Sequence, residues 1–160
     1  MLIGRYSSLS DNITFVFEET KECNAAANHS FDPLTTTNVR AAGKRRQIII
    51  GNDVRISAGV IIMGGDYIGN GAAIEEGTVV SENVPAYAVA VGNSVRIIRC
   101  RFDEETIDLL QKIKWWNWSK VKIRENIHLL SEDVAMFIHK LFCVRQRCIR
   151  VGTNEATVVA

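Results

Sequence analysis

The residues whose types could do chemistry lie in one polar segment near the N-terminus, Asn28-His29-Ser30-Phe31-Asp32. A neutral imidazole has a reference pKa of about 6.5, so His29 can accept a proton from a hydroxyl group at neutral pH and is a candidate general base. Asn28 and Asp32 carry groups that can hydrogen-bond a polar substrate. The same residue types also suit a solvated loop, so the spacing alone leaves both interpretations open.

The other chemical residue types do not form recognisable sites. The cysteines contain no CxxC pair, so we expect reduced thiols rather than a zinc site or a disulfide framework; they are Cys23, Cys100, Cys143 and Cys148. His128 and His139 fall in a C-terminal helical region and are expected to be packing or surface residues. The sequence has no GxSxG motif for a serine nucleophile. Because the cysteines lack the spacing of a zinc site, we expect no metal.

Charge and hydropathy narrow the class of protein. The chain has 160 residues, enough for one domain with a sizeable core and an appendage. Its 19 basic and 18 acidic residues nearly cancel, which disfavours a nucleic-acid partner. No apolar run reaches the roughly 20 residues of a membrane span, and the start MLIGRYSS lacks the apolar core of a signal peptide. We expect a cytoplasmic protein.

The element that must position His29 is a six-residue repeat between Ile50 and Val91. Residues two apart on a strand point to one face, and the intervening Gly, Asn, Asp and Ser residues suit corners. Repetition every six residues predicts a parallel β-solenoid with coils of 18 residues, whereas the turns of a β-sandwich recur about every 8–12 residues. The inward aliphatic series is Ile50, Ile56, Ile62, Ile68, Ile74 and Val80, closed by Ala86.

The repeat has an earlier part and one misfit. Ile3, Leu9 and Phe15 already follow the six-residue spacing, so residues 3–15 should form most of one coil. The spacing from Phe15 to Ile50 is not a multiple of six, so an excursion at about 17–47, which carries His29, should interrupt the winding. Asp66 stands at an inward position where an apolar residue is expected.

Past the repeat, the hydrophobic period becomes helical. Asp103 can cap a helix that continues through Trp116, Ser119 can open a second helix, and Ser131 can open a third. We expect residues 1–100 to form the solenoid, 101–142 a helical appendage, and 143–160 a tail of unknown structure.

Four motifs together resemble the xenobiotic acetyltransferases, the hexapeptide branch that contains chloramphenicol and streptogramin acetyltransferases and many sugar and polysaccharide O-acetyltransferases. They are NHSFD around His29, IIIGNDVRI at 48–56, NVPAYAVAVGN at 83–93 and RFDEETIDLLQKIKWWNW at 101–118. The resemblance implies a left-handed parallel β-helix with a C-terminal helical appendage. It also implies an enzyme, an acyltransferase that moves an acetyl group from acetyl-CoA to a hydroxyl. The family is homotrimeric, with active sites between subunits.

The resemblance assigns roles to particular residues. His29 falls on the position of the general base, and a thioester is activated enough to be attacked directly, without a covalent enzyme intermediate. Beside His29, the polar side chains of Asn28 and Asp32 would suit contact with a polyhydroxyl acceptor, a role that rests on their residue types and not on the resemblance. The positions that match coenzyme A contacts are Ala58, Glu76, Ser81, Arg96 and Arg99. Ile61 and Val79 would stack on one outer face and suit a trimer interface.

Several residues depart from the family pattern. Arg55 replaces the usual Trp, Glu76 replaces a small residue and would face an anionic ligand, and Asp66 replaces an inward Val. Three alternatives to a sugar O-acetyltransferase stay open, and the departures motivate the second of them. One is an acetyltransferase for chloramphenicol or streptogramin, and another is a catalytically inactive trimeric relative. The third, a zinc enzyme of the γ-carbonic anhydrase kind, would need more imidazoles than His29 in the solenoid region.

Overall fold

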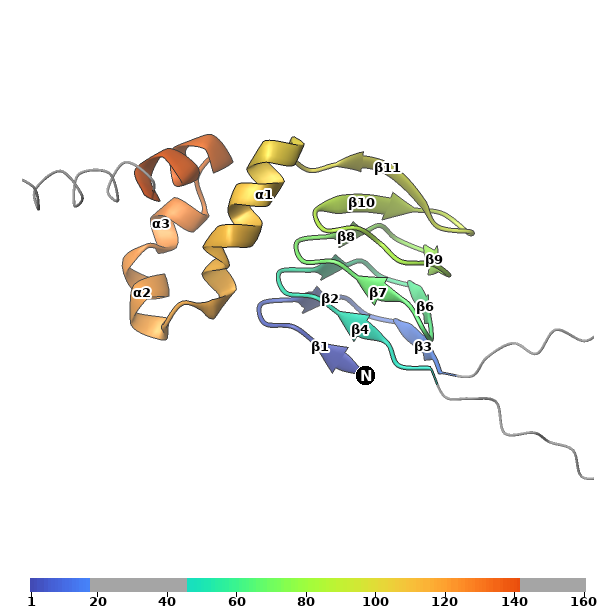
Figure 1. Cartoon of the computed structure of the whole chain (residues 1–160). Helices are drawn as coiled ribbons and strands as arrows, with labels where there is room; N and C mark the ends of the chain where they lie inside the picture. Colours follow the sequence, from blue (N-terminus) through green and yellow to red (C-terminus); the bar gives the residue numbers. More distant parts are fainter. Residues whose placement is uncertain (18–45, 142–160) are drawn as a thin grey trace, which may run out of the picture. The chain divides into compact units, whose positions relative to one another are not determined.

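The computed structural model describes residues 1–17 and 46–141 of the chain. The chain divides into two compact units, Met1–Asp103 and Glu104–Ala160, which are described separately below. The first unit is built from short strands and the second from helices (Figure 1).

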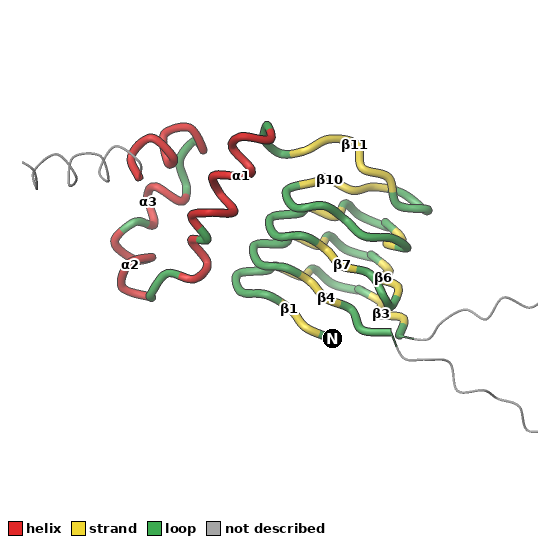
Figure 2. Tube along the Cα trace, in the orientation of Figure 1, coloured by secondary structure: helices red, strands yellow, loops and turns green. Residues whose placement is uncertain are grey.

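The first unit winds its strands into three sheets. The first sheet contains β1 (Leu2–Ile3), β4 (Ile49–Ile50) and β7 (Tyr67–Ile68). The second sheet has the order β11-β10-β8-β5-β2, with β2 at Ser8–Leu9, β5 at Arg55–Ile56, β8 at Ala73–Ile74, β10 at Ala88–Val91 and β11 at Arg96–Cys100. The third sheet contains β3 (Thr14–Val16), β6 (Ile61–Met63) and β9 (Val79–Val80). Figure 2 shows how loops at the corners connect these strands.

The strand registers reveal coils of constant length over most of the unit. Ile50 pairs with Ile68, Ile56 with Ile74, and Ile62 with Val80, always in parallel. Each pair is 18 residues apart, so the predicted coil length is confirmed. These side chains are at most 2% exposed and stack along the interior, where the removal of apolar area from water stabilises the winding.

The N-terminal coil also obeys the predicted spacing. Ile3, Leu9 and Phe15 pair with Ile50, Ile56 and Ile62, which confirms that residues 3–15 form a coil of the same stack. The chain leaves this coil after Phe17 and returns at Arg46, whose backbone N–H donates to the Phe17 carbonyl at 3.1 Å. Both ends of the predicted excursion therefore lie at one corner.

The last coil contradicts the prediction that Ala86 closes the inward series. Ile68 bridges to Val84, and Ile74 pairs with Ala90, so this coil is 16 residues long rather than 18. The shortening has a local cause, because the Asn83 side-chain oxygen accepts the Tyr67 N–H at 2.8 Å, a donor that a backbone carbonyl would otherwise satisfy. Val84, at 1% exposure, takes the buried position expected for Ala86, which is half-buried.

Asp66 does not lie in the sealed interior. Its residue is half-buried at a corner, one position before β7, while Ile48 one coil earlier is fully buried. Partial burial raises the pKa of the Asp66 carboxyl, the positive charge of Arg46 opposes this, and the negative charge of Glu82 adds to it. The misfit is accommodated because the corner leaves the carboxylate partly in water.

In its described residues, 104–141, the second unit is a series of short helices. Their bounds are α1 at Glu104–Ile113, η1 at Trp115–Asn117, α2 at Lys120–Glu125 and α3 at Ile127–Leu130, and residues 134–141 are helical as well. The helix α1 begins directly after Asp103, as predicted, and the Ser119 hydroxyl caps α2 by accepting the Lys122 N–H at 3.2 Å. Within residues 1–17 and 46–141, none of the helices is long and apolar enough to cross a membrane.

Two helix boundaries were predicted wrongly. The first helix does not run through Trp116, because Lys114 adopts a left-handed backbone conformation (φ 46°) that ends α1. Ser131 does not open the helix at residues 134–141. Its hydroxyl instead donates to the Ile127 carbonyl at 3.1 Å, at the C-terminal end of α3. The N-cap of the helix at residues 134–141 is Asp133, whose carboxylate accepts the Ala135 N–H at 2.9 Å.

Candidate active site

The candidate catalytic segment is reached from a defined corner of the coil. His29, Asn28 and Asp32 lie outside the residues that the structure describes. The flanking residues Phe17 and Arg46 are hydrogen-bonded to each other, and Gly65 donates its N–H to the Gln47 carbonyl at 3.2 Å, so both attachment points are held on the stack. The roles of His29, Asn28 and Asp32 therefore stay predictions.

Two of the predicted cofactor residues occupy one corner, between the second and third sheets. Ala58 and Glu76 follow the paired strands β5 and β8, and the Gly77 N–H donates to the Ala58 carbonyl at 3.1 Å, which stacks the two corners. Gly59 and Gly77 follow them with φ values of 70° and 67°, a conformation that glycine adopts without strain. Ala58 is half-buried, and the Glu76 side chain is exposed.

A β-bulge places the two predicted arginines on the same face. In the antiparallel pair β10–β11, Arg99 lies opposite Val89 and Arg96 opposite Val91, although the two arginines are three positions apart. Regular alternation would send them to opposite faces, but the register shifts between Val89 and Ala90. Both guanidinium groups consequently belong to the outer face of the second sheet, where Val89 and Val91 also point.

Arg96 and Ser81 approach the corner from different sides. The Ala90 carbonyl, one residue before Val91, accepts the Glu75 N–H at 3.0 Å, so the Arg96 end of β11 lies beside the corner that carries Glu76. Ser81 is exposed and directly follows β9 in the third sheet. The structure thus gathers Ala58, Glu76 and Arg96 around one corner, with Arg99 further along the second sheet and Ser81 on the third.

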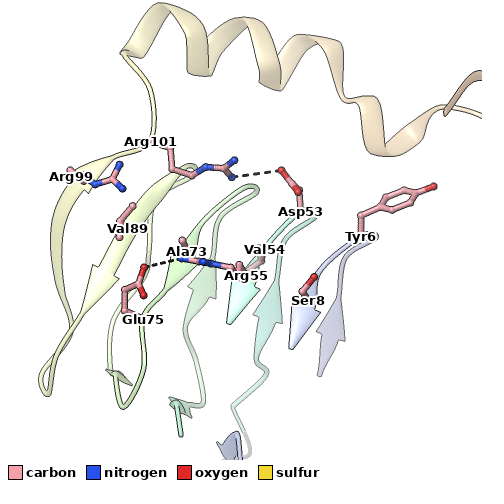
Figure 3. Close-up of a pocket in the computed structure, with 10 residues that line it drawn as sticks. All are labelled: Tyr6, Ser8, Asp53, Val54, Arg55, Ala73, Glu75, Val89, Arg99 and Arg101. Carbon is pink, nitrogen blue, oxygen red and sulfur yellow. Dashed lines mark hydrogen bonds and ion pairs between the residues drawn. The ribbon is translucent and has the colours of Figure 1, made fainter. Parts of the chain in front are cut away.

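A pocket on the outer face of the second sheet brings one predicted cofactor residue, Arg99, together with residues for which no binding role was predicted. The pocket has a volume of about 420 Å³ and includes Arg55, Glu75 and Arg99 (Figure 3). An ion pair joins Arg55 Nη2 to Glu75 Oε1 at 2.9 Å. Arg55, Glu75 and Arg99 lie far apart in the sequence, so no local motif could have revealed that they meet.

Arg101 and Asp53 form an ion pair at one edge of this pocket. Arg101 Nη1 lies 3.8 Å from Asp53 Oδ2 and donates to the Gly71 carbonyl at 2.7 Å. Its guanidinium carbon also lies 5.5 Å from the centre of the Tyr87 ring. Burial raises the pKa of the Asp53 carboxyl, and the positive charge of Arg101 only partly offsets this.

Tyr87 supports that corner from within. Its side chain is 1% exposed, its ring packs against Phe102 with centroids 5.7 Å apart, and its hydroxyl has no hydrogen-bond partner among the described residues. Burial and the negative charge of Asp53 raise the pKa of the phenol, so Tyr87 stays protonated. Tyr87 therefore acts as a packing residue beneath Asp53 and Arg101.

The three-sheet winding and the stacked glycine corners define a protein of six-residue repeats. No protein-family model matches the chain. It is 31% identical over 150 residues to a probable macrolide acetyltransferase of Lysinibacillus sphaericus, covering 85% of this chain and 79% of the relative. It is also 31% identical over 147 residues to a chloramphenicol acetyltransferase of Klebsiella aerogenes, covering 88% of this chain and 70% of the relative.

A solved structure agrees with these relatives. A galactoside acetyltransferase in complex with coenzyme A matches with a TM-score of 0.51 and 27% identity, over 64% of this chain. The match spans 46% of that chain, about half of its length. The present chain belongs to the family of hexapeptide-repeat acetyltransferases that includes the xenobiotic acetyltransferases, and is accordingly an acyltransferase.

Proposed function

We propose that this chain transfers the acetyl group of acetyl-CoA to a hydroxyl group of a sugar or polysaccharide precursor. Membership of the acetyltransferase family supports the reaction, and the similarity to a galactoside acetyltransferase supports a sugar as acceptor. The observation that carries the proposal is the placement of Arg96 beside the stacked corner of Ala58 and Glu76, with Arg99 on the same outer face.

Four residues would hold coenzyme A at this corner and on the adjoining sheets, and Glu76 is the fifth position that matches the family's contacts. The small side chain of Ala58 leaves room for close approach, and Ser81 can donate or accept a hydrogen bond. Arg96 and Arg99 suit phosphate groups, because a guanidinium forms strong charge-assisted hydrogen bonds with phosphate oxygens. Glu76 fits less well, since its exposed carboxylate would repel an anionic ligand, and we expect it to weaken binding.

His29 would act as the general base, with Asn28 and Asp32 binding the acceptor. In this scheme the imidazole takes the proton of the acceptor hydroxyl as that oxygen attacks the carbonyl of the thioester. The carbon–sulfur bond then breaks, and the proton on His29 can pass to the departing thiolate, which balances the reaction. General-base assistance of this kind contributes about 10²–10⁴-fold to a rate.

The proposal includes the left-handed sense of the coil and a homotrimer with active sites between subunits. Two residues of the third sheet support an interface there: Ile61 and Val79 are register partners on its outer face, and both are only half-buried within one chain. Apolar outer positions of this kind favour contact with another chain. A cytoplasmic location is a further prediction and derives from the cysteine usage.

Acetylation of an antibiotic is the second candidate, because relatives that match most of the chain are named macrolide and chloramphenicol acetyltransferases. A turnover assay with acetyl-CoA against hexoses, amino sugars, chloramphenicol and a macrolide separates the two candidates. We expect a preference for the sugars, and a clear preference for either drug would contradict the proposed acceptor.

A calorimetric titration with coenzyme A tests for an inactive relative. We expect binding that weakens in Arg96→Gln and strengthens in Glu76→Ala, which removes the repelling carboxylate. A protein that binds no coenzyme A would instead be a scaffold without this activity.

A further inference from the structure

The pocket on the outer face of the second sheet has an apolar floor and charged walls. Ala73 and Val89 are register partners on β8 and β10, and although both point outward they are only 7% and 4% exposed. Arg55 extends this row on one side and Arg99 on the other, since the register runs Arg55, Ala73, Val89 and Arg99. Figure 3 shows these side chains around the same hollow.

Positive charge predominates in this pocket. Among the residues that the structure describes, its lining contains three arginines, Arg55, Arg99 and Arg101, and two carboxylates, Asp53 and Glu75, which gives an excess of one positive charge. The ion pair of Arg55 with Glu75 uses one N–H at 2.9 Å, whereas a guanidinium has five donors. Within residues 1–17 and 46–141, Glu75 thereby orients Arg55 while other N–H groups of the guanidinium remain for a ligand.

The two arginines of the row face each other across the floor. β5 and β11 are separated by β8 and β10, so the backbones of Arg55 and Arg99 lie about 14 Å apart for strand spacings of about 4.8 Å. Two long side chains that approach from opposite sides of such a gap can meet a single anion above Ala73 and Val89. Carboxylate and phosphate groups suit this arrangement, because both match the fork of a guanidinium.

We infer that this pocket binds an anionic group of the acceptor, so that the preferred acceptors are sugars that carry a carboxylate or a phosphate. The inference rests on the proposed function, because the pocket shares Arg99 with the proposed coenzyme A residues and Glu75 precedes Glu76. An acceptor anchored at Arg55 would lie beside the coenzyme A that the proposed function places at Arg96 and Arg99, with Arg99 between the two ligands. The pocket thus selects the substrate through charge.

The test compares charged sugars with their neutral parents on the full chain. Glucuronate is paired with glucose, and N-acetylglucosamine 1-phosphate with N-acetylglucosamine, both in calorimetric titrations without acetyl-CoA and in turnover assays with it. We expect the charged member of at least one pair to bind more tightly and to have the higher kcat/KM. Which pair responds distinguishes a carboxylate from a phosphate.

Three variants test whether the preference for charged sugars arises in this pocket. Arg55→Gln should lower the affinity for the charged sugar by about 10- to 100-fold and leave the neutral parent within about twofold, as expected for a lost hydrogen bond to a charged group. Glu75→Gln keeps a hydrogen-bond acceptor for Arg55 but removes a negative charge, so it should tighten binding by about two- to fivefold. Arg124→Gln, an equal change of charge in α2, should alter neither.

The outcomes separate this inference from the proposed function. If acetyl transfer occurs but charged and neutral sugars perform equally, the pocket has no such role and the proposed function stands. If no acceptor is acetylated but the charged sugar binds in an Arg55-dependent way, the pocket stands and the proposed function fails. An Arg55→Gln variant that weakens only coenzyme A would assign the pocket to the acetyl donor and overturn the inference.

Discussion

Among single residues, His29 bears the proposed chemistry. Replacing it by alanine removes the proton acceptor and leaves the coil unchanged, so we expect His29→Ala to lower kcat by about 10²–10⁴-fold. The dissociation constant for coenzyme A, measured by calorimetry, should stay the same. His139→Ala, an exposed histidine of the C-terminal helix, is the matched control and should keep full turnover. Unchanged turnover in His29→Ala would exclude a role as general base.

Asp53 makes stability depend on pH. Its pKa is raised in the folded protein, chiefly by burial, so the folded state binds a proton more readily than the unfolded chain does. By linkage, the contribution of Asp53 to the stability of the fold is fully present below its ordinary pKa of 3.8. This contribution is lost as the pH rises through the folded-state pKa. The ionised carboxylate therefore costs stability at neutral pH.

Asp53→Asn tests this dependence. Asparagine has the same shape and tolerates the left-handed backbone conformation of Asp53 (φ 56°). We expect a higher melting temperature than wild type at pH 7 and no difference near pH 3, measured by circular dichroism. A lower melting temperature at pH 7 would mean that the pairing of Asp53 with Arg101 outweighs the cost of burial.

Among the elements, the corners of the coil differ in how much space they leave. Gly71 and Gly77 have nearly the same positive φ, 70° and 67°, but a Cβ at Gly71 would lie against Cε1 and Cδ1 of Tyr87, while a Cβ at Gly77 meets nothing within 4 Å. Tyr87 is 1% exposed and has little room to move. The two glycines thus separate backbone strain from steric conflict.

Alanine at Gly77 measures the cost of backbone strain, and alanine at Gly71 measures that cost together with the steric conflict. Gly77→Ala should cost about 1–2 kcal/mol of unfolding free energy, from the left-handed backbone alone. Gly71→Ala should cost about 1–3 kcal/mol more, because the added methyl group overpacks the buried ring. Urea unfolding followed by circular dichroism gives both values, and equal losses would show that the Tyr87 ring yields at no cost.

For the molecule as a whole, the proposed trimer places the outer face of the third sheet in an interface. A lysine at position 61 would put an unpaired charge there, so Ile61→Lys should weaken trimer formation on the order of a hundredfold or more. Analytical ultracentrifugation measures the change. Tyr67→Lys is the control, since Tyr67 is apolar and 43% exposed on the outer face of the first sheet. Dissociation by Tyr67→Lys but not by Ile61→Lys would move the interface to the first sheet.

The order of the residues alone determined the winding. Inward residues two apart on a strand and a turn every six residues are local properties, so Ile3, Ile50 and Ile68 can each be recognised as inward residues from their neighbours in the sequence. The helical unit could also be predicted, because the hydrophobic period of the sequence changes after the repeat. The ends of its helices depended on the left-handed backbone of Lys114 and on the Asp133 cap.

Only the tertiary structure decided the arrangement of the candidate site. The Asn83 side chain replaces a backbone acceptor and shortens one coil to 16 residues, and a bulge then brings Arg96 and Arg99 to the same face. The pocket joins Arg55 and Glu75 of neighbouring coils to Arg99 of the antiparallel strand β11. Periodicity is a property of each segment, whereas register depends on which distant groups satisfy one another's hydrogen bonds, and it is register that determines which side chains meet.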